Sequence, residues 1–314
     1  MLGWKHECAN ARRYKDVNAR THEGISLPFL SRFHAFTLSR HLLIHIAIVC
    51  IYSLCTLSHI QAQYRPQDMT LNYGNEVRYD IFFKWGILMP RAGEARITFN
   101  SLSHNGQPAS LYRLLFNTTG LIENIYKMRD TLDCYYSSNY ALQYCSKHTQ
   151  ENSFYLVDEL TFSYSGEKTS VHSFRYTPKS VRIDTNLIVT SGYVFDMLGA
   201  TFFLRTLDRK NLKPGDNFPF TVAVGRDLVK ASFRYQNQAI IERDNVKYRT
   251  HYFVIDIYDD VFEQGKAAAE LWVGDDDNFL PIKIRAKLKI GYAEVHYKSS
   301  NNLKRPLECR VVMK

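Results

Sequence analysis

Stretches rich in Val, Ile, Thr, Phe and Tyr follow one another from Glu76 to Tyr297, and clusters of Gly, Pro, Asn and Asp separate them. The first group of residues favours β-strands and the second favours turns. Short strands joined by frequent turns form antiparallel hairpins more readily than parallel units with crossover helices. The predicted strands are Glu76–Phe83, Gly93–Phe99, Leu111–Asn117, Tyr155–Tyr164, Ser170–Thr177, Val181–Ile188, Phe218–Val224, Val229–Tyr235, Tyr248–Ile257, Lys266–Val273 and Pro281–Tyr297.

The last of these stretches alternates apolar and basic residues from Ile282 to Ile290. This period of two predicts a strand with one face in the core and the other in water. The outward cations, about 6.6 Å apart along the strand, are Lys283, Arg285, Lys287 and Lys289. Such a row would suit lipid phosphates or an acidic partner, and it is equally typical of a solvated face that discourages edge pairing.

Three aspartates and an asparagine, Asp275–Asn278, come directly before this strand. We expect them to form a hairpin turn with Gly274 opposite Phe279. That register places Leu271 opposite Ile282 and Glu270 opposite Lys283, so that apolar faces apolar and acid faces base. Clustered carboxylates also suit Ca²⁺. The segment lacks the Gly and the distal Glu of a known calcium loop, which favours the turn.

One segment, Tyr193–Leu207, has the pattern of a helix. Its apolar residues surround most of the helix axis, so we expect it to be buried on most sides. A helix of this kind can be a core element that closes one face of the sheet. It can also be a lid over an apolar hollow, in which case the ligand would contact Phe195, Leu198, Phe202 and Phe203.

Several motifs resemble the domain of unknown function 3108, a family of exported proteins of Gram-negative bacteria. They are the helix Tyr193–Leu207, the turn Leu212–Asp216, the stretch Ala269–Gly291, the pair Tyr79–Phe82 and Ala92–Ala95, and Met128–Asp130. The resemblance covers residues 74 to 297. It implies a curved antiparallel sheet, similar to periplasmic lipoprotein carriers, and it brings no catalytic residue because the family has no established activity. We therefore predict a mainly β protein, with an antiparallel, strongly curved sheet or open partial barrel and one buried helix at about 193–207.

A sixteen-residue apolar run, Leu42–Leu57, follows basic residues and precedes a polar segment. This arrangement is typical of a secretory signal, with cleavage expected after Ala62. The alternative is an uncleaved inner-membrane anchor, although a spanning helix needs about 20 apolar residues. The sequence thus predicts an N-terminal extension and signal over residues 1–62 and a single β domain over residues 63–314. The expected location is the periplasm or the outer membrane.

The charge after position 62 is mild. Residues 63–314 carry 33 Lys and Arg against 28 Asp and Glu, a net charge of +5. A nucleic-acid-binding protein would have more numerous and more clustered basic residues, so we expect no nucleic-acid partner. Weak attraction to an anionic membrane is compatible with this charge.

The predicted β domain contains three cysteines, Cys134, Cys145 and Cys309. Residues 131–147 read as a hairpin centred on Asn139-Tyr140, which places Cys134 directly opposite Cys145. Opposed residues have Cα atoms about 4.5 to 5.5 Å apart, within reach of a disulfide. In an oxidising compartment the two are expected to be bridged. A pair of reduced thiols is the alternative, and Cys309 is expected to be unpaired.

The motifs of known catalytic classes are absent: there is no Gly-x-Ser-x-Gly, His-Glu-x-x-His, phosphate-binding glycine loop or Cys-x-x-Cys. We therefore predict no catalytic residue, metal or cofactor. The favoured function is a binding or carrier module for lipid or another apolar or amphiphilic envelope molecule. The alternatives are a structural or protein-interaction protein with a filled interior, and an envelope enzyme with polar groups that converge in a cleft.

Overall fold

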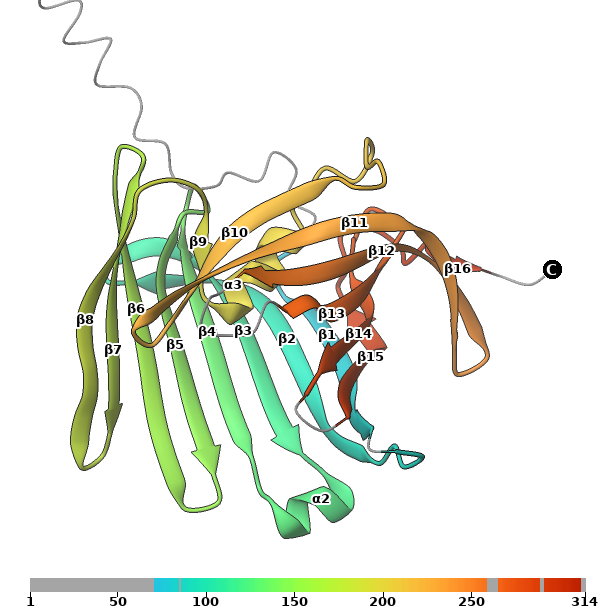
Figure 1. Cartoon of the computed structure of the whole chain (residues 1–314), viewed down its shortest axis with the longest axis horizontal. Coiled ribbons are helices and arrows are strands. Elements are labelled where there is room, and N and C mark those ends of the chain that lie inside the picture. The colour runs from blue at the N-terminus through green and yellow to red at the C-terminus, as the bar shows by residue number, and fades with distance from the viewer. Residues whose placement is uncertain (1–70, 85, 259–264, 289–290, 312–314) are drawn as a thin grey trace, which may run out of the picture. The chain divides into compact units, whose positions relative to one another are not determined.

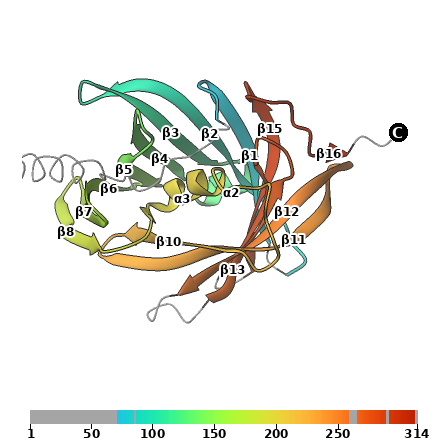
Figure 2. The same cartoon turned by 90° about the horizontal axis from the view of Figure 1, so that it is seen from above.

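The computed structural model of the chain describes residues 71–84, 86–258, 265–288 and 291–311. These residues form one 16-stranded sheet. The sheet curves into a nearly closed, barrel-like wall with a helix inside it (Figures 1 and 2). The predicted fold class is thereby confirmed. Among the described residues, no helix is long and apolar enough to span a membrane.

The strands are longer and more numerous than the sequence pattern predicts. The first half of the sheet contains β1 (Asn75–Lys84), β2 (Arg91–His104), β3 (Gln107–Thr118), β4 (Arg129–Ser137), β5 (Leu142–Glu151), β6 (Phe154–Ser165), β7 (Lys168–Thr177) and β8 (Ser180–Val189). The second half contains β9 (Val194–Phe195), β10 (Asn217–Val224), β11 (Asp227–Arg243), β12 (Val246–Tyr258), β13 (Gly265–Gly274), β14 (Pro281–Lys287), β15 (Tyr292–Asn301) and β16 (Arg310–Val311). The helices in the described part of the chain are α2 (Gly120–Ile125), which the sequence did not predict, and α3 (Met197–Leu204).

Strand order explains how the sheet nearly closes. Neighbours in sequence pair antiparallel from β1 to β8 and from β10 to β15, and β1 also pairs with β15. The strand path therefore ends at β8 on one side and at the short β9, parallel to β10, on the other. At this seam Arg226, in the turn after β10, donates a hydrogen bond of 3.1 Å to the carbonyl of Arg182 on β8.

Two predictions about the C-terminal strands are wrong. The predicted strand Pro281–Tyr297 is divided into β14 and β15, because the chain reverses at Gly291, whose φ of +74° favours glycine. Leu288, which the alternation assigned to the core, lies at this turn and is 46% exposed. Lys289 and Ile290 lie outside the described residues.

The predicted register of the β13–β14 hairpin is also wrong, by two residues. Leu271 lies opposite Ile284, and Glu270 lies opposite Arg285. The connection is longer than a four-residue turn because Phe279 and Leu280 are buried instead of extending the ladder, and Gly274 N–H donates to the carbonyl of Leu280. A shift of two residues keeps every side chain on its face. Apolar side chains therefore still lie opposite apolar ones, and the acidic Glu270 still lies opposite a basic residue.

Helix α3 is shorter than the predicted Tyr193–Leu207 but is buried as predicted. Asp196 begins it as the N-cap, since its side chain accepts a hydrogen bond of 2.6 Å from Gly199 N–H. The two residues before the cap are extended and form β9. The four side chains proposed for ligand contact, Phe195, Leu198, Phe202 and Phe203, are at most 3% exposed.

Two adjacent phenylalanines of α3 contact opposite walls of the sheet. Phe202 packs against rings of β2, β3 and β4, which belong to Phe99, Tyr112 and Tyr136. Phe203 packs against rings of β9, β10 and β11, which belong to Phe195, Phe220 and Phe233. Figure 2 shows α3 between these two walls. The helix thus connects strands that the seam would otherwise leave apart.

Removal of the Phe202 ring is expected to destabilise the fold strongly. Phe202→Ala should lower the free energy of unfolding by about 3 to 5 kcal/mol, because it leaves a cavity among three aromatic rings. Urea unfolding followed by tryptophan fluorescence measures this. The control is Leu121→Ala on α2, where the side chain is 80% exposed and the expected change is within about 0.5 kcal/mol. Equal effects of the two substitutions would contradict the role of α3.

Candidate functional site

The two cysteines of the β4–β5 hairpin face each other in the core. Cys134 pairs with Cys145 in the strand register, as predicted. Both side chains are buried, and their sulfur atoms lie 3.2 Å apart as free thiols. The disulfide itself stays a prediction. Cys309, expected to be unpaired, is a buried free thiol.

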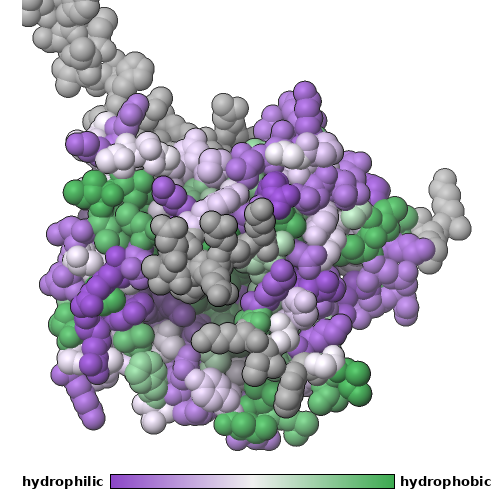
Figure 3. Space-filling view, viewed as in Figure 1, coloured by the Kyte–Doolittle hydropathy of each residue, from purple (hydrophilic) through white to green (hydrophobic). Residues whose placement is uncertain are grey.

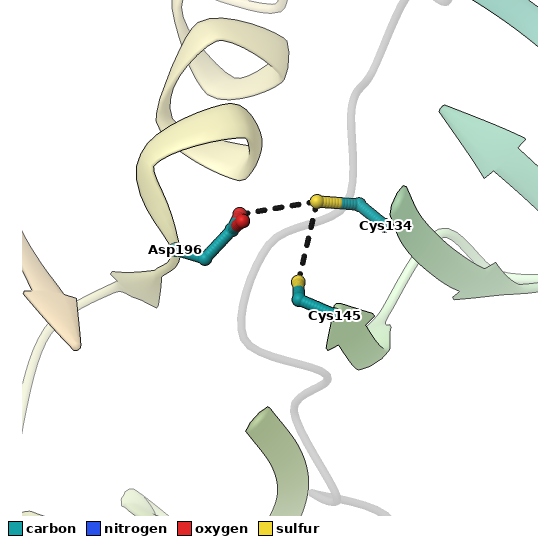
Figure 4. Close-up of side chains that lie close together, drawn as sticks. All are labelled: Cys134, Cys145 and Asp196. Carbon is teal, nitrogen blue, oxygen red and sulfur yellow. Dashed lines mark hydrogen bonds between the residues drawn. The ribbon is translucent and has the colours of Figure 1, made fainter. Parts of the chain in front are cut away.

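A carboxylate from α3 joins the two thiols (Figure 4). The Sγ of Cys134 donates a hydrogen bond of 3.0 Å to Oδ1 of Asp196, the N-cap of the helix. Each of the three residues offers one potential ligand atom, and these atoms all lie within 4.8 Å of one another. All three residues are buried. Helix capping therefore brings a carboxylate from a distant part of the chain to the cysteine pair.

The buried environment keeps the thiols neutral. Burial, with the neighbouring acidic groups, raises the pKa of Cys134 well above its ordinary value. Burial also raises the pKa of Cys145, to about 12. Burial raises the pKa of the Asp196 carboxyl, although hydrogen bonds from Cys134 and from Gly199 N–H oppose that shift. A protonated thiol is a poor nucleophile, so the cluster alone does not have the character of a catalytic cysteine site.

A cavity of about 100 Å³ opens beside the cluster, at the seam of the sheet. Cys145 and Asp196 form part of its lining. The apolar lining residues are Leu132, Leu160, Met197, Ala223 and Val224, and the charged ones are Lys147, Asp158 and Arg175. Met197 and Val224 are 54% and 40% exposed, so part of the apolar lining meets solvent. We call this space the seam cavity.

One buried polar atom near the cluster has no partner. The hydroxyl of Tyr136 makes no hydrogen bond, although the residue is almost completely buried. Burial, and then the acidic groups of Cys134, Cys145 and Asp196, raise the pKa of this phenol. The orphan hydroxyl is therefore within electrostatic range of the cluster. Buried polar groups without a partner are uncommon in folded proteins.

The helix residues proposed from the sequence for ligand contact do not line the seam cavity. Phe195, Leu198, Phe202 and Phe203 belong to the aromatic core, and their contact with a ligand stays a prediction. The members of the same segment that reach the cavity are Asp196 and Met197. The sequence pattern missed both. An aspartate directly before an apolar helical pattern is an N-cap signal that would have placed Asp196 at the helix start.

The basic row of β14 is partly neutralised. Lys283 Nζ lies 3.2 Å from Glu294, and Arg285 pairs with Glu294 at 2.8 Å and with Glu270 at 3.3 Å. Lys287 is exposed, and Lys289 lies outside the described residues. Lys283 and Arg285 are therefore paired cations, and the Glu294 carboxylate that they share is itself buried. Binding of an anionic partner there stays a prediction.

The aspartates of the β13–β14 turn serve separate contacts. Asp275 lies 2.9 Å from His251, and Asp277 pairs with Arg209. Asp276 accepts hydrogen bonds from the N–H groups of Asn278 and Cys309. The three carboxylates are thus directed to different partners, which supports the turn interpretation over a calcium loop.

The ion pairs around Glu294 predict a pH dependence of stability. Burial raises the pKa of Glu294, but hydrogen bonds from Arg285 and His296 and the charge of Lys283 outweigh it and lower the pKa to about 2. The carboxylate therefore stabilises the fold at neutral pH, and this contribution, up to about 3 kcal/mol, is lost as the pH falls from about 4.5 to 2.

Glu294→Gln should reduce this acid-induced loss of stability, measured by urea unfolding across that pH range. Glu167→Gln, at an exposed turn, should not change it, and identical pH profiles for Glu294→Gln and the wild type would contradict the assignment.

Comparison with known proteins gives a family but no activity. A search of curated protein sequences found no match. Among solved structures, a similar one is the beta-barrel-like protein of domain of unknown function DUF1849 from Brucella abortus. It is 10% identical with a TM-score of 0.48, and the similarity covers 74% of this chain and 98% of that one. Residues 78–298 match the family described as protein of unknown function DUF3108, most of the chain. The resemblance inferred from the motifs is thereby confirmed, and the chain belongs to the DUF3108 family.

Proposed function

We propose that the protein is a non-enzymatic binding module of the bacterial cell envelope, which takes part of an apolar or amphiphilic molecule at the seam of its sheet. The observation that carries the proposal is the seam cavity, in which apolar side chains lie next to charged ones. Ligand sites commonly combine an apolar lining with a few polar groups that fix orientation. An acyl end would contact Leu160 and Met197, and a polar group would meet Lys147 and Arg175.

The size of the seam cavity limits what can enter. A volume of about 100 Å³ corresponds to about three water molecules. It therefore suits the end of a chain or a small side group rather than a whole lipid. Because the seam has no continuous backbone pairing between β8 and β10, separation of these edges would admit a longer ligand.

Membrane contact is part of the proposal, and an exposed apolar end of the sheet supports it. Ile87, in the β1–β2 connection, is 100% exposed, and Leu121 and Ile125 on α2 are 80% and 79% exposed. Thr119 N–H donates to the carbonyl of Ala92, so α2 lies beside the start of β2. Figure 3 shows hydrophobic residues along the lower edge of this face, where Figure 1 places α2. Exposed apolar patches of this kind mark interaction surfaces.

A second candidate, a structural or protein-interaction protein, is favoured by the packing of α3. The rings of Phe202 and Phe203 are surrounded by aromatic residues of both walls. This region of the interior is filled, as that function requires. The seam cavity lies beside this packed core, at Met197 and Val224, and it is the reason why we prefer the binding module.

Export is expected to leave a mature N-terminus within a few residues of Gln63, because the apolar run Leu42–Leu57 is short for a membrane span. This run lies outside the described residues. N-terminal sequencing of the protein from the periplasmic fraction measures the cleavage position. Recovery of only the full-length chain in the membrane fraction would favour the anchor.

If the protein is a binding module, a bulky side chain that blocks the seam cavity should prevent ligand binding. Val224→Trp should reduce the lipid bound to protein isolated from the cell envelope by roughly tenfold, because lost apolar contacts in a pocket are worth about 1 to 3 kcal/mol. Native mass spectrometry quantifies the bound lipid. Binding of a fluorescent fatty acid to the same preparations gives a second readout.

The matched control is Ile188→Trp. Ile188 is also an exposed β-branched residue, on β8, and does not line the cavity. It should leave lipid binding unchanged, and both variants should melt within a few degrees of the wild type. A wild-type protein that carries no lipid and binds no fatty acid would contradict the binding module and leave the structural function.

A further inference from the structure

The cysteine and aspartate cluster has the composition of a metal site. Among the described residues, Cys134, Cys145 and Asp196 form a group in which the potential ligand atoms lie within 4.8 Å of one another. They come from β4, β5 and the cap of α3, three elements that the aromatic core holds together. Figure 4 shows the two sulfurs and the carboxylate turned toward one another.

The donor atoms and their spacing suit Zn²⁺. Two thiolates and one carboxylate are ordinary zinc ligands, whereas Ca²⁺ and Mg²⁺ prefer oxygen alone. A tetrahedral Zn²⁺ holds two sulfurs about 3.8 Å apart, and a sulfur and an oxygen about 3.5 Å apart. The corresponding distances are 3.2 Å between the sulfurs and 3.0 Å between Cys134 Sγ and Asp196 Oδ1. The ligands would therefore separate by only about half an ångström around an ion.

Space for a fourth ligand exists on the side of the seam cavity. Cys145 and Asp196 both line this cavity, so an ion bound between them would meet it. Three protein ligands with one open position are typical of zinc sites that bind water or substrate, whereas structural zinc sites have four protein ligands. Tyr136, whose buried hydroxyl has no hydrogen-bond partner, lies two residues from Cys134 on β4 and therefore on the same face of that strand.

We propose that Cys134, Cys145 and Asp196 bind a Zn²⁺ ion whose fourth position faces the seam cavity. Both thiols lose their protons to water when the two zinc–sulfur bonds form. The same sulfurs would be joined in the disulfide predicted from the sequence, so zinc binding and the disulfide exclude each other. The ion would be a Lewis acid at the wall of the seam cavity, where it would attract an anionic or polar group of a ligand.

The direct test uses Co²⁺ as a coloured substitute for Zn²⁺. The chain isolated from the cell envelope is purified with a phosphine reductant, treated with a chelator and titrated with Co²⁺ under anaerobic conditions. The expected result is saturation at one Co²⁺ per chain, with the near-ultraviolet absorption of cobalt–thiolate bonds. Zn²⁺ should then displace the cobalt and remove the absorption.

Variants identify the ligands. Cys134→Ser and Cys145→Ser should each abolish the thiolate absorption at one equivalent. Cys309→Ser is the matched control, because Cys309 is also buried and free but belongs to the separate cluster around Tyr248 and Tyr297. Asp196→Asn keeps an N-cap residue and therefore remains informative if the cysteine variants fail to fold. It should weaken Zn²⁺ binding by at least about tenfold, as losses around zinc sites commonly do.

The proposal is overturned if the reduced wild-type chain shows no stoichiometric cobalt–thiolate absorption. It is also overturned if the absorption persists in Cys134→Ser and Cys145→Ser, or if Cys309→Ser removes it. Elemental analysis of protein isolated from the envelope without reductant or chelator gives an independent result. We expect zinc with two unbridged thiols at these positions. A Cys134–Cys145 disulfide without metal would contradict the proposal.

Discussion

The contact of one short helix with both walls of the curved sheet is the interaction on which the structure depends. Phe202 reaches β2, β3 and β4, whereas its neighbour Phe203 reaches β9, β10 and β11. Backbone hydrogen bonds cannot join these walls at the seam, because β8 and β9 are the ends of the strand path. Burial of the aromatic side chains of α3 therefore replaces the missing strand pairing.

The candidate site is a consequence of the same helix. The helix starts close to the β4–β5 hairpin, where its N-cap Asp196 accepts a hydrogen bond from Cys134. The next residue, Met197, lies at the seam cavity. A stabilising element thus also brings a carboxylate, two thiols and an apolar opening together. This explains how a chain without a recognised catalytic motif still contains a concentrated group of chemically capable side chains.

The local features of the fold were predictable from the sequence. Stretches rich in β-branched and aromatic residues identified most strands, the apolar circumference of residues 193–207 predicted a buried helix, and symmetry about Asn139-Tyr140 placed Cys134 opposite Cys145. Features that depend on long-range packing were not predictable in this way. The β13–β14 register moved because Phe279 and Leu280 are drawn into the core. The division of Pro281–Tyr297 was missed because the alternation runs up to Ile290, directly before the turn residue Gly291. The cluster was missed because Asp196 lies 62 positions from Cys134 in the chain.

A nearly closed sheet supported by an internal helix should also unfold as one unit, and native-state hydrogen exchange at increasing urea concentrations tests this most directly. If α3 joins the walls, the amides of β3 and β11 open with the same free energy and the same dependence on urea. The edge strand β8 exchanges earlier, because one of its sides has no strand partner. Independent opening of β10 and β11 at a lower free energy than β2 to β4 would contradict the account, since the two walls would then not depend on a shared helix.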